Sequence, residues 1–105
     1  MEEILALLDV NDNRFCADCG KEDTQIVSIN HACFICPDCA VIHKVLGSSV
    51  SHLKPLHSEF SIKQLGLMRI GGNQPMKEFF TSYEIPENSP ANFKYLTQAA
   101  AYYRR

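Results

Sequence analysis

Residues 16–19 read Cys-Ala-Asp-Cys and residues 36–39 read Cys-Pro-Asp-Cys, with sixteen residues between the two motifs. Two residues between paired cysteines let one tight turn direct both sulfur atoms at a single ion, and the spacer is long enough for a β-hairpin to return the second pair. The pattern is typical of one tetrahedral, structural zinc site, since four thiolates leave no coordination position for water. Two disulfides, or four unrelated buried cysteines, would not need this spacing. The predicted ligands are Cys16, Cys19, Cys36 and Cys39.

Two further residues near the motifs are candidates for the same site. Cys33 is out of register with both pairs, and we interpret it as a small buried apolar side chain on a strand. His31 is a possible fifth donor, but four cysteines already fill a tetrahedral shell. We therefore interpret His31 as a turn residue.

The composition is that of one small domain. The chain has 105 residues, 46% of them hydrophobic, and a formal net charge of −2. This length predicts a single domain, 1–105, with a modest core that a metal site helps to stabilise. Paired cysteines with one left over favour a reducing, cytoplasmic compartment, and no apolar run reaches the roughly 18 residues of a membrane span. The negative net charge gives no electrostatic reason to expect nucleic acid as a partner.

The residue pattern predicts an α+β fold, in which a small three-stranded sheet with the four-cysteine knuckle is surrounded by about five helices. Short β-rich runs at 26–29 and 32–35 predict a hairpin, and 50–56 predicts a third strand with Pro55 at an edge. Helices are expected at 2–10, from Pro37 to Gly47, from Ser61 to Ile70, from Asn73 to 82, and from Ser89-Pro90 to the C-terminus.

Capping and periodicity add detail to the last three helices. Ser61 and Gln64 resemble a capping box, and Asn73 is expected to cap the fourth helix. The apolar residues expected to face the core are Met76, Phe79, Phe80, Phe93, Leu96, Ala100 and Tyr103.

Short motifs accompany the cysteine pairs: Ser28-x-Asn30, Ile42-His43-x-x-Leu46-Gly47, Val50-Ser51 and Gly72-Asn73. With the cysteines they resemble the Arf GTPase-activating protein (ArfGAP) domain over nearly the whole chain. Generic four-cysteine fingers do not share the Ile-His-x-x-Leu-Gly run or the later Gly-Asn. The C-terminal Tyr95-x-x-x-Ala99-Ala-Ala-Tyr-x-Arg104 is similar to the end of this domain in the Golgi-coat-associated branch of the family.

The resemblance implies a GTPase activator acting in trans, and the chain has no nucleophile set or phosphate-binding loop of a self-contained enzyme. Such a protein binds an Arf-family GTPase in its GTP-bound state, inserts an arginine finger and regulates vesicle coat cycling in Golgi traffic. It would be cytoplasmic and peripherally associated with Golgi membranes, with coat proteins bound through regions outside this chain. The positions that the family uses toward Arf correspond to Ile42, Lys44, Ser51 and Lys54.

Several positions depart from the family pattern. Lys44 stands at the arginine-finger position, where lysine keeps the charge but lacks the planar fork of arginine. Ile26 replaces the usual Trp, Ala32 the usual Gly and Lys54 the usual Arg, and the family's Leu-x-Leu-Asp-x-Trp segment is absent around 57–61.

The sequence leaves two other functions open. The chain would be a pseudo-GAP if it kept the Arf contact but gave weak or no stimulation, and it would then act as a scaffold. A four-cysteine finger that binds DNA, as GATA-type fingers with a similar spacer do, requires a basic face beside the second cysteine pair. The helix there carries only Lys44 and a histidine, in an acidic chain.

Overall fold

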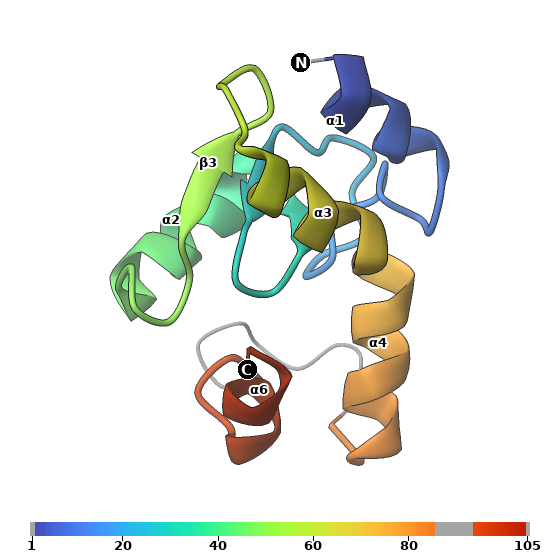
Figure 1. Ribbon diagram of the computed structural model, residues 1–105. Helices are drawn as coiled ribbons and strands as arrows, with labels where there is room; N and C mark the ends of the chain where they lie inside the picture. Colours follow the sequence, from blue (N-terminus) through green and yellow to red (C-terminus); the bar gives the residue numbers. More distant parts are fainter. Residues whose placement is uncertain (1, 86–93, 105) are drawn as a thin grey trace.

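A three-stranded antiparallel sheet is the element on which the other parts of the fold pack (Figure 1). The structure is a computed structural model and describes residues 2–85 and 94–104. The strands are β1 (Ile26–Ser28), β2 (Cys33–Ile35) and β3 (Leu53–Pro55), in the order β2-β1-β3. Val27 of β1 pairs with Phe34 on one side and with Lys54 on the other. The predicted α+β class with a three-stranded sheet is confirmed.

The third strand is shorter than the predicted 50–56. Val50 and Ser51 donate their backbone N–H groups to the Gly47 carbonyl, at 3.1 and 2.9 Å. These two residues therefore form a turn after the preceding helix. Pro55 does lie on an edge strand, where its missing N–H costs no ladder hydrogen bond.

Helices cover both faces of the sheet. Among the described residues they are α1 (Glu2–Ala6), the 3₁₀ helix η1 (Leu7–Asp9), α2 (Pro37–Leu46), α3 (Ile62–Ile70), α4 (Asn73–Ser82) and α6 (Gln98–Tyr103). The helix expected at 2–10 is thus α1 continued by η1. Figure 1 shows α3 running into α4 at an angle, with α6 below the sheet.

The core is divided in two because successive side chains of a strand point to opposite faces. Val27 and Phe34 face a cluster that includes Ile4, Leu56 and Met68, supplied mainly by α1 and α3. Cys33 and Ile35 face the other cluster, which holds the four cysteines of the two motifs, Met76 and Phe80 of α4, Ala100 of α6, and Tyr95 of the turn before α6. Cys33 is fully buried, as expected.

The residues predicted to cap the start of α3 do so in the structure. Ser61 Oγ accepts a hydrogen bond from Gln64 N at 3.1 Å and the Gln64 side chain accepts one from Ser61 N at 3.0 Å, so the capping box is confirmed. Met68 is the buried residue of this helix. Leu67 and Ile70 remain exposed.

The expectation that Asn73 caps α4 was wrong. Gly72, at φ 115°, occupies the cap position, and Asn73 is the first helical residue. Its buried side chain binds the backbone of distant segments instead. Oδ1 accepts from Phe34 N at 2.6 Å, and Nδ2 donates to the carbonyls of Phe15 at 2.6 Å and Phe34 at 3.0 Å. Asn73 therefore joins α4, β2 and the segment before Cys16.

The last helix differs from the prediction at its start. Ser89, Pro90 and Phe93 lie outside the described residues, and α6 begins after Thr97, whose Oγ accepts from Ala100 N. Residues 95–97 form a turn, so the helical spacing of α6 does not extend back to them. As a result Leu96, expected in the core, is 61% exposed, and Tyr95 is buried in its place.

Replacing Asn73 with alanine should lower the free energy of unfolding by about 2–4 kcal/mol, because buried backbone groups of β2 would lose their partners. Urea unfolding of the metal-loaded protein measures this change. Gln74→Ala, at the exposed neighbour on the same helix, is the matched control and should change the free energy by less than about 0.5 kcal/mol. Equal losses for the two variants would contradict this role for Asn73.

Candidate functional site

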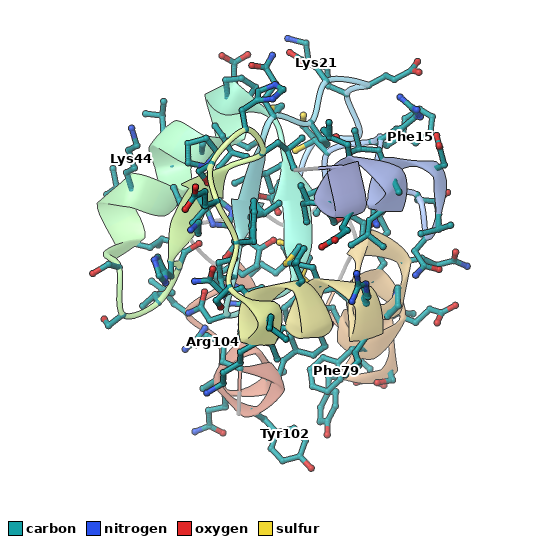
Figure 2. All side chains as sticks on the ribbon, turned by 45° about the horizontal axis from the view of Figure 1, so that its top comes forward. Phe15, Lys21, Lys44, Phe79, Tyr102 and Arg104 are labelled. Carbon is teal, nitrogen blue, oxygen red and sulfur yellow. The ribbon has the colours of Figure 1, made fainter. Side chains whose placement is uncertain are left out.

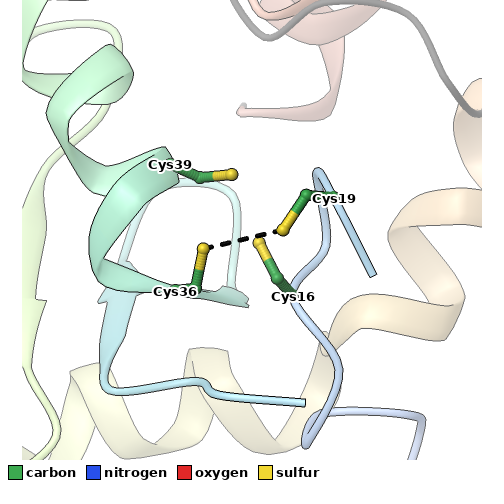
Figure 3. Close-up of side chains that lie close together, drawn as sticks. All are labelled: Cys16, Cys19, Cys36 and Cys39. Carbon is green, nitrogen blue, oxygen red and sulfur yellow. Dashed lines mark hydrogen bonds between the residues drawn. The ribbon is translucent and has the colours of Figure 1, made fainter. Parts of the chain in front are cut away.

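The four cysteines of the two motifs come together, as predicted, between the loop after η1 and the start of α2 (Figure 3). Their sulfur atoms all lie within 4.8 Å of one another, and those of Cys19 and Cys36 are 3.6 Å apart. A tetrahedral ion with bonds of about 2.3 Å to sulfur holds its ligands about 3.8 Å apart. The donor set and spacing therefore fit one metal ion.

Local hydrogen bonds bend each motif toward the ion position. Gly20 N donates to the Cys16 carbonyl at 2.9 Å, and Gly20 adopts φ 79°, a left-handed conformation that suits glycine. Cys36 is the N-cap of α2, and Cys39 lies in its first turn. The first knuckle is thus a tight loop, whereas the second is the start of a helix.

The surroundings of the cysteines would oppose thiolates in the absence of a cation. Burial raises the pKa of Cys16 and Cys39 above the usual value. Burial also opposes ionisation of the more exposed Cys19, but a backbone hydrogen bond from Lys21 and the neighbouring sulfur atoms lower its pKa. A bound cation supplies the positive charge that stabilises four thiolates together.

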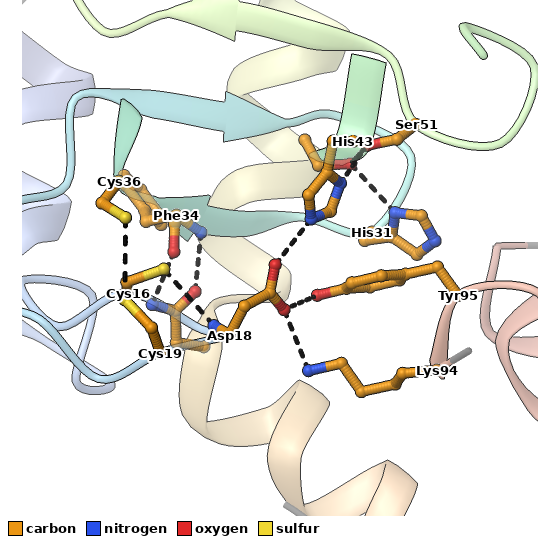
Figure 4. A network of polar contacts seen from close by, with 12 residues as sticks. Cys16, Asp18, Cys19, His31, Phe34, Cys36, His43, Ser51, Lys94 and Tyr95 are labelled. Carbon is orange, nitrogen blue, oxygen red and sulfur yellow. Dashed lines mark hydrogen bonds and ion pairs between the residues drawn. The ribbon is translucent and has the colours of Figure 1, made fainter. Parts of the chain in front are cut away.

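A buried carboxylate links the first knuckle to α2 and to the C-terminal segment (Figure 4). Asp18 lies between Cys16 and Cys19, and its side chain is 5% exposed. Its oxygens accept from His43 Nε2 at 2.7 Å, from the Tyr95 hydroxyl at 2.6 Å and from Lys94 Nζ at 2.9 Å. Asp18 thus connects three segments of the chain.

The charges and donors around Asp18 explain how its carboxylate can be buried. Burial by itself would raise the pKa of Asp18, but the hydrogen bond from His43 and the Lys94 ammonium hold it well below its usual range. Burial and the adjacent carboxylate raise the pKa of Tyr95, so its hydroxyl keeps its proton and donates. Asp18 is therefore an ionised acceptor surrounded by donors.

Lys44 follows His43 directly but points the other way. His43 is fully buried, whereas Lys44 is exposed at the end of α2, as Figure 2 shows. Lys44 lines two hollows of about 260 Å³ each, one shared with Gly47, Ser48 and His52 and the other with Ile26, Lys54 and Pro55. A positive charge thus stands between two surface hollows.

The amino-acid sequence matches the family ArfGap, described as "Putative GTPase activating protein for Arf", over residues 1–105. The chain belongs to the ArfGap family. The resemblance found in the sequence is thereby confirmed.

Relatives and a solved structure agree with this assignment. The chain is 33% identical over 102 residues to the ADP-ribosylation factor GTPase-activating protein GCS1 of Saccharomyces cerevisiae, covering 96% of this chain and 29% of that protein. It is 39% identical over 85 residues to the ADP-ribosylation factor GTPase-activating protein AGD12 of Arabidopsis thaliana, covering 79% of this chain and 25% of that protein. The chain thus spans less than a third of the length of these relatives.

The fold matches a solved structure of the same kind. The crystal structure of a "putative GTPase activating protein for ADP ribosylation factor" from Cryptosporidium parvum superposes with a TM-score of 0.90 at 25% identity. The match covers 98% of this chain and 83% of that one. The predicted fold class is therefore confirmed by a protein of known structure.

The other residues that the ArfGap resemblance implied lie in different environments. Ile42 is 42% exposed on α2. Lys54 lies over the Phe60 ring, with Nζ 5.0 Å from its centroid, and donates to the Glu59 carbonyl. Ser51 is only 3% exposed, and its hydroxyl is bonded to His43 inside the domain.

Sequence reasoning missed the buried polar residues of this ArfGap site. Asp18 and Lys94 have charged side chains, for which the default expectation is a solvated surface. The signal that was present is His43, a histidine on the side of α2 that also carries Cys39 and Ala40. His31 is not part of the four-cysteine cluster; it is fully buried in its turn, and its Nδ1 lies 2.9 Å from Ser28 Oγ.

No helix within residues 2–85 and 94–104 is long and apolar enough to cross a membrane.

Metal binding at pH 7 should release at least two protons per ion, because burial raises the pKa of Cys16 and Cys39 and both must become thiolates. Affinity should accordingly fall as pH is lowered. Calorimetric titration of Zn²⁺ into the metal-free protein, in buffers of different ionisation enthalpy, counts the protons.

Cys33→Ala is the matched control for this titration, since Cys33 lies outside the cluster, and it should leave the proton count unchanged. Cys39→Ser should lower both the count and the affinity. Binding without proton release would contradict thiolate ligation.

Proposed function

We propose that this chain binds an Arf-family GTPase in its GTP-bound state and accelerates hydrolysis of the bound GTP. The observation that carries the proposal is that Lys44 is exposed on α2 directly after the buried, hydrogen-bonded His43. The family resemblance assigns the arginine-finger position to Lys44. The named relatives, GCS1 and AGD12, are Arf GTPase-activating proteins and support it. Residues 1–105 would act as a single domain.

The chemistry asked of Lys44 is electrostatic. As the γ-phosphoryl group transfers to water, negative charge develops on its oxygens and on the leaving oxygen, and a finger cation stabilises that charge. The GTPase supplies the nucleotide, its metal ion and the attacking water. Lys44 would supply the cation through one ammonium group, where arginine supplies a planar fork.

Exposed apolar residues beside Lys44 support a protein partner on the same surface. Val41, Ile42 and Val45 are 61%, 42% and 84% exposed on α2. Aliphatic side chains around a finger exclude water from the contact, which strengthens the interaction of its charge with phosphate. Lys54, on the strand beside α2, would add a second cation at the edge.

Ser51 takes a different part in this proposal. Its hydroxyl is 2.6 Å from His43 Nδ1, and the side chain has almost no exposed surface for a partner to touch. We assign Ser51 to the support of α2 from within the domain.

The metal of this domain would be one structural zinc ion bound by Cys16, Cys19, Cys36 and Cys39. Four sulfur donors favour Zn²⁺ over the hard cations Mg²⁺ and Ca²⁺, and they leave no open position for catalysis. The ion would fix the first knuckle and the start of α2, and so stabilise a small core.

The cellular setting proposed for the chain follows from its family. It would be cytoplasmic and peripherally associated with Golgi membranes, and it would regulate coat cycling, with coat proteins bound through other regions. One specific residue favours a second candidate function, an Arf-binding scaffold without stimulation. That residue is again Lys44, because an ammonium does not reproduce bidentate contact with phosphate.

Single-turnover hydrolysis on GTP-loaded Arf tests both candidates with three proteins. Lys44→Ala should reduce the rate to that of Arf alone, because the finger charge is lost. Lys44→Arg should raise it by about tenfold or more, because fingers of this kind contribute about 10³–10⁵-fold. Lys63→Ala, at an exposed lysine of α3, is the matched control and should not change the rate.

The pattern of results separates the two functions. An inert native domain that still binds Arf-GTP, with activity appearing in Lys44→Arg, identifies the scaffold. Absence of both binding and stimulation in all variants removes Arf as the partner.

A further inference from the structure

Both ring nitrogens of His43 are used inside the domain. Nε2 donates to the Asp18 carboxylate at 2.7 Å, and Nδ1 lies 2.6 Å from Ser51 Oγ. The ring is fully buried, so no water replaces either bond. Lys44 is the next residue, so these contacts hold the part of α2 from which the Lys44 side chain extends.

The first chain of contacts runs from Nε2 to the C-terminal segment. Asp18 is held in turn by the Tyr95 hydroxyl at 2.6 Å and by Lys94 Nζ at 2.9 Å. The Lys94 side chain is 4% exposed, which is rare for lysine and requires a paired charge. Figure 4 shows Asp18 between His43 on one side and Tyr95 and Lys94 on the other.

The second chain of contacts runs from Nδ1 to the same segment by another route. Ser51 Oγ is 2.8 Å from Ser28 Oγ, and Ser28 Oγ is 2.9 Å from His31 Nδ1. Arg104 donates to His31 Nε2 at 3.2 Å. Burial, followed by the Arg104 charge, lowers the pKa of His31 to about 3, so His31 is neutral and Nδ1 carries the proton donated to Ser28.

The two chains of contacts meet at their far ends. Arg104 also donates to the Tyr95 carbonyl at 3.0 Å. The Tyr95 ring lies against both histidines, with ring centroids 4.6 Å from those of His31 and of His43. The contacts therefore form a closed ring that passes through His43 in the last turns of α2, and the C-terminal segment supplies one side of it.

We propose that Lys94, Tyr95 and Arg104 are positioning residues for Lys44, which they orient through Asp18, His31 and His43. This inference rests on the proposed finger role of Lys44 and extends it to a segment about fifty residues further along the sequence. The C-terminal segment completes the site although none of these three residues needs to touch Arf. Loss of one contact leaves Asp18 or His43 short of a partner, and the last turn of α2 becomes free to move.

Amide hydrogen exchange on the zinc-loaded chain tests the inference without relying on activity. Tyr95→Phe removes only the hydroxyl bound to Asp18. Exchange at residues 43–47 should accelerate by about tenfold, the factor expected for loss of one hydrogen bond to a charged group. Exchange in β1 and β2 should change much less. Tyr83→Phe, at a 51% exposed tyrosine, is the matched control and should leave both regions unchanged.

A second readout distinguishes positioning from general stability. In a Lys44→Arg background, Tyr95→Phe should lower the saturating rate of Arf-GTP hydrolysis by about tenfold and change the half-saturating concentration by less than about twofold. With His43→Asn also present, Tyr95→Phe should have no additional effect, because it acts through His43.

The outcomes are decisive in either direction. Uniform acceleration of exchange across the domain, or none at residues 43–47, overturns the positioning role. Local acceleration in a domain that stimulates no Arf, even as Lys44→Arg, keeps the structural inference and removes the proposed function. If His43→Asn does not fold, the exchange profiles of Tyr95→Phe and Lys94→Met are sufficient to accept or reject the positioning role.

Discussion

The buried carboxylate of Asp18 is the group on which the arrangement of the site depends. It belongs to the first cysteine knuckle, and it binds α2 through His43 and the C-terminal segment through Tyr95 and Lys94. A charge this far from water is stable only while its donors stay in place. Three segments that are distant in sequence are therefore held together by one charge requirement, in addition to the packing of apolar side chains.

The four-cysteine cluster and this polar network use the same short loop for different purposes. Cys16 and Cys19 point their sulfur atoms toward the second cysteine pair, while Asp18 between them points toward His43 (Figures 3 and 4). A metal ion would fix the loop from one side and the network fixes it from the other. In a chain of 105 residues, whose core is small and divided by the sheet, such fixed points replace apolar area that the chain does not have.

The sequence predicted what depends on local rules. The cysteine spacing predicted the four-cysteine cluster, the Ser61–Gln64 capping box predicted the start of α3, and the β-rich runs predicted the hairpin. Prediction from the sequence failed where a polar side chain binds a segment that is distant along the chain. Asparagine is a common helix-capping residue, but the Asn73 side chain binds the backbone of β2. Tyr95 is buried in the core, where the helical spacing predicted Leu96. Such roles depend on long-range contacts, which leave no periodic signal along the chain.

The environment of Lys44 indicates what would change with lysine in place of the family's arginine. The direction of the side chain would change little, whereas the interaction of its end group with phosphate would change more. In the proposed arrangement His43 orients the backbone at this point, and its buried contacts do not involve the side chain that follows it. Lysine and arginine would therefore leave α2 in the same direction, beside the two hollows that Lys44 lines. What differs is the end group: an ammonium is a compact, strongly hydrated charge, and it must lose more hydration to reach a phosphate oxygen than a guanidinium does.

The exposed aliphatic side chains of Val41, Ile42 and Val45 would favour that dehydration once a partner covers them. The strength of a lysine finger would thus depend on how fully the partner closes over the end of α2.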